Sequence, residues 1–455
     1  MDKIEQKILN TIDAHREEII KIGRDIWEHA ECGYKEVRTS RLFQDHMKKL
    51  DLSVETGLAI TGAKAYLKGI EKEPVTVALV GELDALPIPD SPSANPETGA
   101  AHCCGHNAQM AALMGSAFAL CDPEIKEALD GEVVFFAVPA EEFVEVEFKN
   151  QLMKDGKIRY GGGKSELIRI GAFDDIDVAV GHHATINADI QVINNTNNGF
   201  LNKIVHFYGV SSHAADAPYK GVDALNAATL AIQAVNMQQE SYRDQDSVRV
   251  HGFISRGGTA MNIIADHTTL EYSVRANNIR AIENANEKFD RAVKAGAMAS
   301  GCGIDIFTLP GYLPTVPVDD LRAVNEAVSI FTDKYNVKMA DPNLKDGGST
   351  DFGDLSSLKP LLQFYTGGYT GVLHDKNMHP TDEDIAYVLP AKIFALTAYN
   401  LLKEKARYAK ELKENFKPVM TKDDYINYME AHILTESIPA TPLKFPLDKF
   451  LAFYD

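Results

Sequence analysis

The sequence is poor in cysteine, and its basic residues are outnumbered by acidic ones. The five cysteines are odd in number and lack the spacing of a disulfide framework, which favours a protein of the reducing cytoplasm. Lysine and arginine together number 46, against 65 aspartates and glutamates, so the formal net charge is −19. Because nucleic acids and anionic membranes are bound through basic surfaces, this balance argues against both kinds of partner.

Long apolar runs are also absent from the sequence. No apolar run approaches the ~20 residues of a membrane-spanning helix. Residues 1–31 form an amphipathic pattern of acidic and basic residues, without the apolar core of a signal peptide. We therefore expect a cytoplasmic protein with no membrane partner.

What is present is the pattern of an α/β protein with more than one domain. A chain of 455 residues exceeds one ordinary hydrophobic core, so two domains are expected. Apolar, β-branched runs at 75–80, 133–138 and 176–180 are separated by helical patterns, as in an open α/β sheet. Polar residues cluster where these strands end, which is where such sheets place their functional sites.

The pattern changes near residue 197. Strand and helix signals then follow in the order β-α-β-β-α-β, which is typical of a small ferredoxin-like domain. We predict an α/β fold with an open mixed sheet, interrupted by a ferredoxin-like α+β lid or dimerisation domain. The predicted parts are the catalytic domain at 1–196 and 312–405, the inserted domain at 197–311, and a helical C-terminal extension at 406–455 that docks on the surface.

The segment from His102 to Asn107 is the first candidate metal-binding site, because it holds two thiols and two imidazoles just before an apolar helical pattern. Cys104 and His106 are two positions apart at the start of that helix, so a thiolate and an imidazole can reach a common metal ion. Gly105 lets the backbone bend around the ion, and the helix N-terminus favours the thiolate. Cys103 has a simpler interpretation, since buried cytosolic thiols commonly serve as small apolar side chains.

Further ligand candidates follow the later strands. Glu141 and Glu142 come directly after the strand at 133–138, and two histidines follow the strand at 176–180. A glutamate pair at a strand end is commonly a solvated edge, but this one follows an apolar strand and precedes the histidine pair. Because side chains alternate along an extended segment, His182 and His183 cannot both face one site.

These motifs resemble those of the dinuclear-metal amidohydrolases and peptidases, a family that includes aminoacylase, plant auxin-conjugate hydrolases and bacterial aminobenzoyl-glutamate hydrolase. The similarity extends from residue 29 to about residue 405 and is strongest to the branch with a Cys-Gly-His motif. The matching segments are 29–36, 84–87, 104–106, 139–142, 181–183, 212–215, 262–266, Arg275, 348–351 and 373–374.

The resemblance implies a centre of two divalent ions, zinc or manganese, with Cys104 as the bridging thiolate. The remaining ligands would be Glu142 and His374 for one ion, and His106 and His183 for the other. The family pattern favours His183 over His182, and the spacing to the following Asp382-Glu383 favours His374 over His379.

Two carboxylates would support the chemistry of this centre. Asp84 would orient an imidazole ligand. Glu141 would act as the general base that takes a proton from the attacking water and returns it to the leaving amine.

The inserted domain would supply the residues that contact the substrate. By resemblance, His213 reaches the active site of the partner subunit of a homodimer and stabilises the oxyanion, while Asn262 and Arg275 hold a substrate carboxylate. Arg275 lies on a strand and Asn262 in the connection before it, so we expect both to face one cleft. A simpler interpretation of Arg275 is an exposed strand residue in a salt bridge. The implied activity is a metal-dependent amidohydrolase or metallopeptidase that cleaves N-acyl amino acids or small dipeptide-like conjugates.

The chain departs from the family pattern at three places. Glu82 stands where the wider family has a histidine, Asn107 stands where many relatives have aspartate, and the segment 143–163 is longer than in auxin-conjugate hydrolases and could line the substrate entrance.

Two other functions compete with the metal-dependent one. Cys104 could act as the nucleophile of a thiol hydrolase, or the chain could be a non-catalytic ligand-binding protein, although a binder would not need Glu141.

Overall fold

The computed structural model describes residues 1–69, 74–341 and 346–441, and its chain divides into two compact units. The larger unit consists of residues 1–197 and 315–422. The smaller unit consists of residues 198–314 and, in its described part, residues 423–441.

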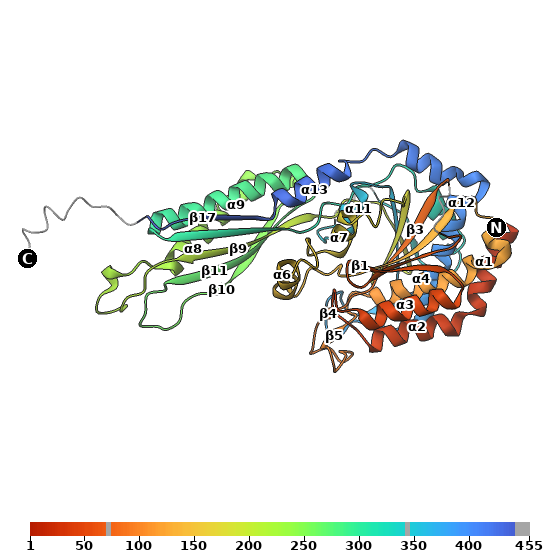
Figure 1. Ribbon diagram of the computed structural model, residues 1–455, viewed down its shortest axis with the longest axis horizontal. Coiled ribbons are helices and arrows are strands. Elements are labelled where there is room, and N and C mark those ends of the chain that lie inside the picture. The colour runs from red at the N-terminus through yellow and green to blue at the C-terminus, as the bar shows by residue number, and fades with distance from the viewer. Residues whose placement is uncertain (70–73, 342–345, 442–455) are drawn as a thin grey trace, which may run out of the picture. The chain divides into compact units, whose positions relative to one another are not determined.

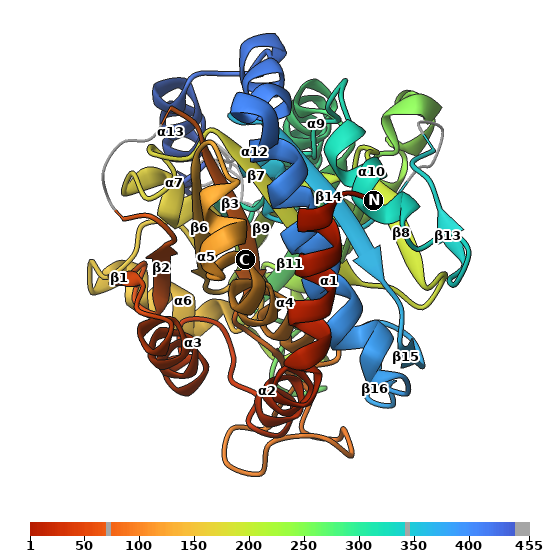
Figure 2. The ribbon, with the colours of Figure 1, turned by 90° about the vertical axis from the view of Figure 1, so that its right-hand side faces the viewer.

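An eight-stranded mixed sheet forms the centre of the larger unit (Figure 1). Its strand order, β1-β2-β6-β3-β7-β14-β8-β13, can be followed by the labels in Figure 2. The strands are β1 (Ser53–Leu58), β2 (Gly62–Tyr66), β3 (Thr76–Glu82), β6 (Glu132–Val138), β7 (Val178–Ala184), β8 (Ile190–Ile193), β13 (Val337–Lys338) and β14 (Leu361–Thr366). Strands β6, β3, β7 and β14 are parallel neighbours. Every residue of β3 and β6 is buried, as expected for apolar strands covered on both faces.

The helices of this unit cover both faces of the sheet. They are α1 (Lys3–Ala14), α2 (Arg16–Glu28), α3 (Val37–Lys49), α4 (His106–Leu120), α5 (Pro123–Glu127), α6 (Val146–Lys154), α7 (Gly163–Arg169), α10 (Arg322–Ser329), α11 (Phe352–Ser356), η4 (Asp384–Val388) and α12 (Leu389–Asn415). Figure 2 shows α1, α4 and α12 together in front of the sheet, and α4 and α12 both contact β3 and β7. Two short hairpins complete the unit, β4 (Leu86–Pro87) with β5 (Ala100–Ala101) and β15 (Tyr369–Thr370) with β16 (His379–Pro380).

Helix α12 is long and largely buried in the core of the larger unit. Together with η4 it is long and apolar enough, by length and composition, to cross a membrane. However, 89% of its most apolar window is buried inside the structure, as in the core helix of a soluble protein. The helix is kinked at residues 403–406, where the backbone leaves the helical conformation.

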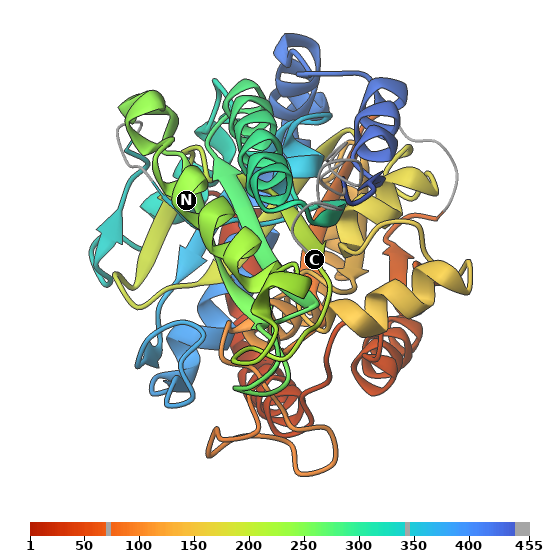
Figure 3. The same ribbon diagram turned by 90° about the vertical axis from the view of Figure 1, so that its left-hand side faces the viewer.

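The smaller unit has the order β9 (Gly199–Tyr208), α8 (Ala224–Asn236), β10 (Arg249–Arg256), β11 (His267–Ala276), α9 (Ile279–Ser300) and β12 (Gly303–Pro310). Together with β17 (Leu434–Ile438), these strands form a sheet in the order β10-β11-β9-β12-β17, and all neighbouring strands are antiparallel. Two helices, α8 and α9, pack against each other and against this sheet (Figure 3). Asp223 and Asn278 cap the two helices by accepting hydrogen bonds from backbone N–H groups of their first turns. The predicted α/β fold with an inserted ferredoxin-like domain is confirmed.

The C-terminal extension differs from the expected surface helix. After helix α13 (Lys422–Ala431), strand β17 (Leu434–Ile438) pairs with β12 and becomes an edge strand of the smaller unit's sheet. The prediction of a helical extension at 406–455 agrees with the end of α12 and with α13, but it missed β17, and residues 442–455 lie outside the described residues. Strand β17 is five residues long and largely exposed, so it lacks apolar periodicity. Its strand conformation depends on backbone hydrogen bonds to β12.

Candidate metal centre

The carboxyl ends of three parallel strands meet at one edge of the larger sheet. Strands β3, β6 and β7 are neighbours, and each ends in residues that the sequence singled out. Asp84 follows β3, Glu141 and Glu142 follow β6, and His183 lies near the end of β7. The N-terminus of α4 adds Cys104 and His106 to this edge, because the α4 helix packs against β3 and β7.

Two groups of ligand atoms share the thiol of Cys104. In the first group, the ligand atoms of Cys104, His106 and His183 lie within 4.8 Å of one another, and Cys104 Sγ is 3.1 Å from His183 Nε2. In the second group, the ligand atoms of Cys104, Glu142 and His374 lie within 4.8 Å of one another. His374 Nε2 is 3.3 Å from both Cys104 Sγ and Glu142 Oε1. The structure thus brings together all five side chains that the resemblance implied as ligands.

The chemistry of this donor set fits two divalent ions. Among the described residues, His106 Nε2 and Glu142 Oε1 are buried atoms without a hydrogen-bond partner, which is rare for buried polar atoms. Burial raises the pKa of the Cys104 thiol well above its usual value, and the charge of Glu142 adds to this effect. A bound divalent ion would reverse the effect, because it deprotonates a coordinating thiol outright.

Three backbone positions around the centre have positive φ angles. Gly105 has φ +83°, and a Cβ there would lie 2.4 Å from Ala184 Cβ, so only glycine fits this turn. Ala140 and His374 are not glycines and yet have φ +50° and +67°. Such conformations cost of order 1–3 kcal/mol and persist where surrounding contacts fix them. His374 is fixed in this way, since its N–H donates a hydrogen bond of 2.7 Å to the carbonyl of Cys103.

Asp84 connects the two ligand groups. Its Oδ2 accepts a hydrogen bond of 2.9 Å from the backbone N–H of Glu142, and its Oδ1 lies 3.3 Å from His106 Nδ1. That ring nitrogen is also 2.9 Å from the Asp84 carbonyl oxygen, so Nδ1–H points at Asp84 and Nε2 faces the other ligands. Burial alone would raise the pKa of Asp84, but the hydrogen bond and charge of His106 outweigh burial and hold this pKa at about 2.

Glu141 lies beside the first ligand group. Its Oε2 is 3.9 Å from His106 Nε2, and the side chain is 10% exposed. Burial raises the pKa of Glu141 well above its usual value, and the neighbouring Glu82 and Glu142 raise it further. A carboxyl group in this environment holds a proton more readily than an exposed one, which suits proton transfer.

The competing histidines lie away from the centre. His182 is fully buried, and its Nε2 is 2.8 Å from Thr366 Oγ1. Its ring packs against Phe364 and Phe394, on the face of the sheet opposite to His183. His379 is exposed, pairs with Thr370 in the β15–β16 hairpin, and its ring Nδ1 bonds to the carbonyl of Asn377.

Three residues that sequence reasoning left without a role support the centre. Lys149, in the long segment 143–163, donates a hydrogen bond of 2.5 Å from Nζ to the carbonyl of Glu142. Asn107 donates to the Gly23 carbonyl and to the Tyr387 hydroxyl and accepts from Tyr369, and a carboxylate could not donate to that carbonyl. Glu36 accepts a hydrogen bond from the backbone of Ala140 and lies in the first matching segment, which was the available signal.

In the smaller unit, His213 and Asn262 lie side by side. His213 forms an antiparallel bridge with Ile263, and the N–H of Ala214 donates to the carbonyl of Asn262 at 2.9 Å. Nδ1 of His213 accepts hydrogen bonds from the backbone N–H groups of Ala215 and Asp216, at 3.2 and 3.0 Å. The proton of the neutral ring is therefore on Nε2, and the side chain is exposed.

Arg275 lies at the opposite end of the same hairpin, so the expectation that it shares a cleft with Asn262 in one chain is wrong. Arg275 pairs with Arg249 at the start of β10, whereas Asn262 lies in the loop that connects β10 and β11. Strand β11 begins at His267, at the end of the hairpin where Asn262 lies. Arg275 is eight positions further along this strand, which corresponds to ~27 Å in an antiparallel sheet. The Arg275 guanidinium stacks 4.8 Å from the Phe200 ring, and Nε donates to Ser273 Oγ.

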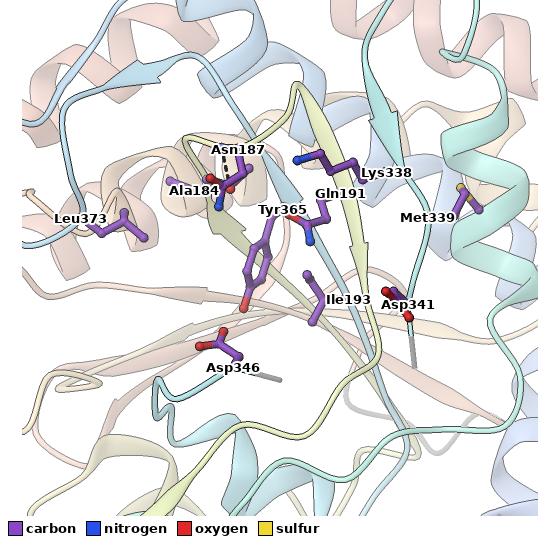
Figure 4. A pocket seen from close by; sticks show the side chains of 11 residues that line it. Ala184, Asn187, Gln191, Ile193, Lys338, Met339, Asp341, Asp346, Tyr365 and Leu373 are labelled. Carbon is purple, nitrogen blue, oxygen red and sulfur yellow. Dashed lines mark hydrogen bonds between the residues drawn. The ribbon is translucent and has the colours of Figure 1, made fainter. Parts of the chain in front are cut away.

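A cavity of about 700 Å³ adjoins the metal centre in the larger unit (Figure 4). The Tyr365 ring, which lines the cavity, lies 5.4 Å from the His183 ring. Leu373, which precedes His374, also lines it. In Figure 4 the Tyr365 hydroxyl points toward Asp346. The cavity is therefore placed to receive part of a molecule that reaches the centre.

Comparison with known proteins identifies the relatives of this chain. Residues 195–299 match the peptidase dimerisation domain of the M20 family. The chain is 26% identical to Xaa-Arg dipeptidase of Homo sapiens over 448 residues, which covers 92% of this chain and 93% of that protein. The chain is a homologue of the M20 peptidases and amidohydrolases. The resemblance that the sequence motifs indicated is thereby confirmed.

Other M20 relatives agree with this assignment. The chain is 24% identical to a p-aminobenzoyl-glutamate hydrolase from Escherichia coli, over 74% of this chain and 67% of that protein. A crystal structure of a dinuclear metal-binding M20 peptidase from Bacillus subtilis has the same fold, with a TM-score of 0.65 and 22% identity, and covers 86% of this chain and 99% of that one. The named relatives of the chain are peptidases and hydrolases.

Proposed function

We propose that this protein is a metal-dependent amidohydrolase that cleaves N-acyl amino acids or small dipeptide-like conjugates with a free carboxylate. The observation that carries the proposal is the pair of ligand groups that share the Cys104 thiol, with Glu141 beside them. Residues 1–196 and 312–405 would form the catalytic domain, and residues 197–311 the lid and dimerisation domain.

Each side chain has a defined part in this activity. His106 and His183 would hold one ion, Glu142 and His374 the other, and Cys104 both. Two divalent ions, when bound, would polarise the amide carbonyl and acidify a water. Zinc accepts this mixture of sulfur, nitrogen and oxygen donors, and manganese is the alternative.

Glu141 takes the proton of the attacking water and transfers it to the nitrogen of the leaving amine. Asp84 keeps the ring of His106 and the backbone of Glu142 in position through the contacts described above. His213 donates from Nε2 to the oxyanion, because its Nδ1 is already an acceptor.

A homodimer is supported by the smaller unit. Strand β17 pairs with β12 at one edge of the sheet, whereas no described strand pairs with the outer side of β10. Strand β10 exposes Phe253 and Ile254, α8 exposes Leu230, and Met237 is exposed at the C-terminal end of α8. An open strand edge with exposed apolar side chains is a surface that a second copy of the chain can cover.

The separation of Asn262 and Arg275 along the hairpin supports a model in which they act at different metal centres of a homodimer. One chain cannot place Asn262 and Arg275 on the same carboxylate, because they lie at opposite ends of β10 and β11. His213 and Asn262, which lie together, would act on the partner's centre, and Arg275 would act on the centre of its own chain. The Arg275 guanidinium would grip both carboxylate oxygens of the substrate.

The remaining parts of the proposal concern substrate and compartment. The cavity beside Tyr365 would hold one side of the amide, and relatives named as a dipeptidase, a deacetylase and an aminobenzoyl-glutamate hydrolase cleave bonds of this kind. Five free cysteines and a net charge of −19 support a cytoplasmic enzyme without a nucleic-acid or membrane partner.

A panel of N-acyl amino acids and dipeptides, supplied to the metal-loaded protein, tests the proposal. The wild type should hydrolyse at least one member, and Glu141→Gln should not do so at a comparable rate. Among the alternatives, a thiol hydrolase would keep its activity in chelator and lose it on alkylation of Cys104. A ligand-binding protein would bind panel members without cleaving them.

A further inference from the structure

A row of polar side chains leads from the metal centre across the larger sheet. His183 on β7 pairs with Tyr365 on β14. Tyr365 pairs in turn with Gln191 on β8, and Gln191 pairs with Lys338 on β13. Residues paired between neighbouring strands point to the same face, so these four side chains, which we call the polar row, lie on the face that carries the metal centre. Because neighbouring strands are ~4.8 Å apart, the backbones of His183 and Lys338 are ~14 Å apart.

Three members of the polar row, Tyr365, Gln191 and Lys338, line the cavity beside the centre. Each carries a hydrogen-bond donor, in turn a hydroxyl, an amide and an ammonium group. Among the described residues, none of these three groups has a hydrogen-bond or ion-pair partner. In Figure 4 the Lys338 ammonium points toward Asn187, whose side-chain amide is a further donor in the cavity wall. These donors are therefore open to a bound molecule.

Two carboxylates of the cavity wall leave the Lys338 ammonium without a countercharge. Asp346 accepts a hydrogen bond of 2.8 Å from the backbone N–H of Gly348, and the Tyr365 hydroxyl points toward it (Figure 4). Asp341 already has an interaction partner. Neither forms an ion pair with Lys338 within the described part of the chain. In a protein of net charge −19, whose mean field repels anions, such a local cation is what can hold an anionic group.

We propose that the polar row binds a second carboxylate of the substrate, besides the one proposed for Arg275, and that this carboxylate ends the acyl group. Lys338 pairs with the carboxylate, while Gln191 and Tyr365 donate hydrogen bonds to polar atoms of the acyl chain. The ~14 Å between the backbones of His183 and Lys338 leaves room for several carbon atoms between the scissile carbonyl and this carboxylate. The inference rests on the proposed function and names its substrate class, which is amino acids acylated by a dicarboxylic acid.

Kinetics on a matched set of acyl amino acids tests this inference. Succinyl, glutaryl and adipoyl amino acids are compared with butanoyl, pentanoyl and hexanoyl counterparts, in which a methyl group replaces the carboxylate. The metal-loaded wild type should cleave at least one diacid derivative with a kcat/KM at least ~10-fold above that of its counterpart, as expected for one charge-assisted contact in a partly exposed cavity. This preference should weaken as salt is added, because salt screens exposed charges.

Variants of Lys338 connect the preference to the cavity. Lys338→Met should abolish the preference, Lys338→Glu should reverse it, and Lys338→Arg should retain most of it, because only the positive charge is required. Lys338 is exposed on the edge strand of the sheet, so these variants should fold. Lys334→Met is the matched control. It removes the same charge from a lysine that lines a different cavity, and it should keep the wild-type preference.

The possible results separate this inference from the proposed function. If the wild type cleaves both members of every pair equally, the proposed function stands and the inference is overturned. A preference for acyl chains that end in an ammonium group, such as 5-aminopentanoyl, would overturn it by assigning the cavity to Asp346. A diacid preference that Lys338→Met retains would also overturn it. If the metal-loaded wild type cleaves no acyl amino acid or dipeptide, the proposed function fails together with this inference.

Discussion

Glu36 Oε1 accepts a hydrogen bond of 2.8 Å from the backbone N–H of Ala140, across 104 positions of sequence. Its other oxygen accepts from Thr61 Oγ1 at 2.7 Å, and the side chain is fully buried. Ala140 has the positive φ angle that turns the chain at the end of β6. A carboxylate from the N-terminal segment thus fixes the turn that directs Glu141 and Glu142 toward the centre.

We expect Glu36→Ala to lower the free energy of unfolding by ~1–3 kcal/mol, because it leaves the buried N–H of Ala140 without an acceptor. Glu36→Gln should be milder, since the amide oxygen can still accept that hydrogen bond. Chemical denaturation of the metal-free proteins measures both effects. Equal stability of Glu36→Ala and wild type would show that the hydrogen bond does not hold the turn.

The glutamate pair should separate chemistry from metal binding. Glu141→Gln keeps the shape of the side chain but cannot accept a proton, so kcat should fall at least ~10²-fold while the metal content stays. Glu142→Gln should instead lower the metal content, because Glu142 Oε1 belongs to the second ligand group. Elemental analysis and steady-state kinetics on both variants give the comparison. Near-normal kcat in Glu141→Gln would require another general base.

Mixed dimers test which chain supplies each residue. His213→Ala should cost ~10²-fold in kcat, as for the loss of one oxyanion donor. A mixture of the His213→Ala and Glu141→Gln proteins should regain activity, because one metal centre of each heterodimer then has an intact Glu141 from one chain and an intact His213 from the other. Arg275→Ala mixed with Glu141→Gln should not, since Arg275 and Glu141 would serve the same centre. Failure of the first mixture, in protomers shown to exchange, would mean that His213 serves its own chain or does not act. Rescue in the second mixture would place Arg275 at the partner's centre.

Docking of α13 should depend on pH through His432 and Glu283. His432 Nδ1–H donates to the carbonyl of Tyr428, so Nε2, 3.0 Å from a Glu283 oxygen, can donate only when the ring is doubly protonated. Burial lowers the pKa of His432, but the bond to Glu283 outweighs burial and raises this pKa above 6.5. The stabilisation is therefore complete below pH 6.5 and is lost as the pH rises through the raised value.

Glu283 determines the low pH at which the interaction between His432 and Glu283 is lost. Burial alone would raise its pKa, but the bonds to His432 and Tyr428 hold it below 4.5, so its contribution is lost as the pH falls through that lowered value. Hydrogen exchange of residues 423–441 should show the strongest protection between about pH 4.5 and 6.5, after correction for intrinsic rates. His432→Gln should abolish the loss of protection at higher pH. A pH profile identical in wild type and variant would remove His432 from this role.

Much of the fold and of the centre could be predicted because both follow local rules. Buried parallel strands are continuous apolar runs, and their carboxyl ends gather polar residues, so the glutamate pair and the histidine pair could be predicted to lie near each other. Alternation along β7 predicts only that His182 and His183 face opposite sides of the sheet, and the family pattern selected His183. The family resemblance supplied what local rules do not, namely the selection of His374 from a segment without periodicity.

The errors have a common physical origin in pairing between distant segments. Asn262 and Arg275 are thirteen positions apart, and only the register of β10 against β11 shows that they lie at opposite ends of the hairpin. Strand β17 has no apolar pattern of its own and takes its conformation from β12. The contacts of Glu82 with Lys164 and of Glu36 with Ala140 likewise join segments that the sequence separates by 82 and 104 positions.

The adjacent thiols of Cys103 and Cys104 allow a matched test of whether Cys104 is the ligand shared by the two ions. Cys104→Ser should lose metal, because a serine hydroxyl is a far weaker anionic ligand than a thiolate. Cys103→Ser should retain it, since Cys103 contributes only its backbone carbonyl, to His374 N–H, near the centre. Metal content per chain after identical dialysis decides between the two variants. Equal loss in both would point to a folding defect instead of a missing ligand.

The central claim is that hydrolysis depends on two divalent ions at the Cys104 centre, and metal removal with reconstitution tests it most directly. Protein freed of metal, as verified by elemental analysis, should not hydrolyse an N-acyl amino acid that the loaded enzyme cleaves. Activity should return as zinc or manganese is added back, with two equivalents per chain bound at full activity. Undiminished hydrolysis by verified metal-free protein would contradict the account and favour a thiol mechanism.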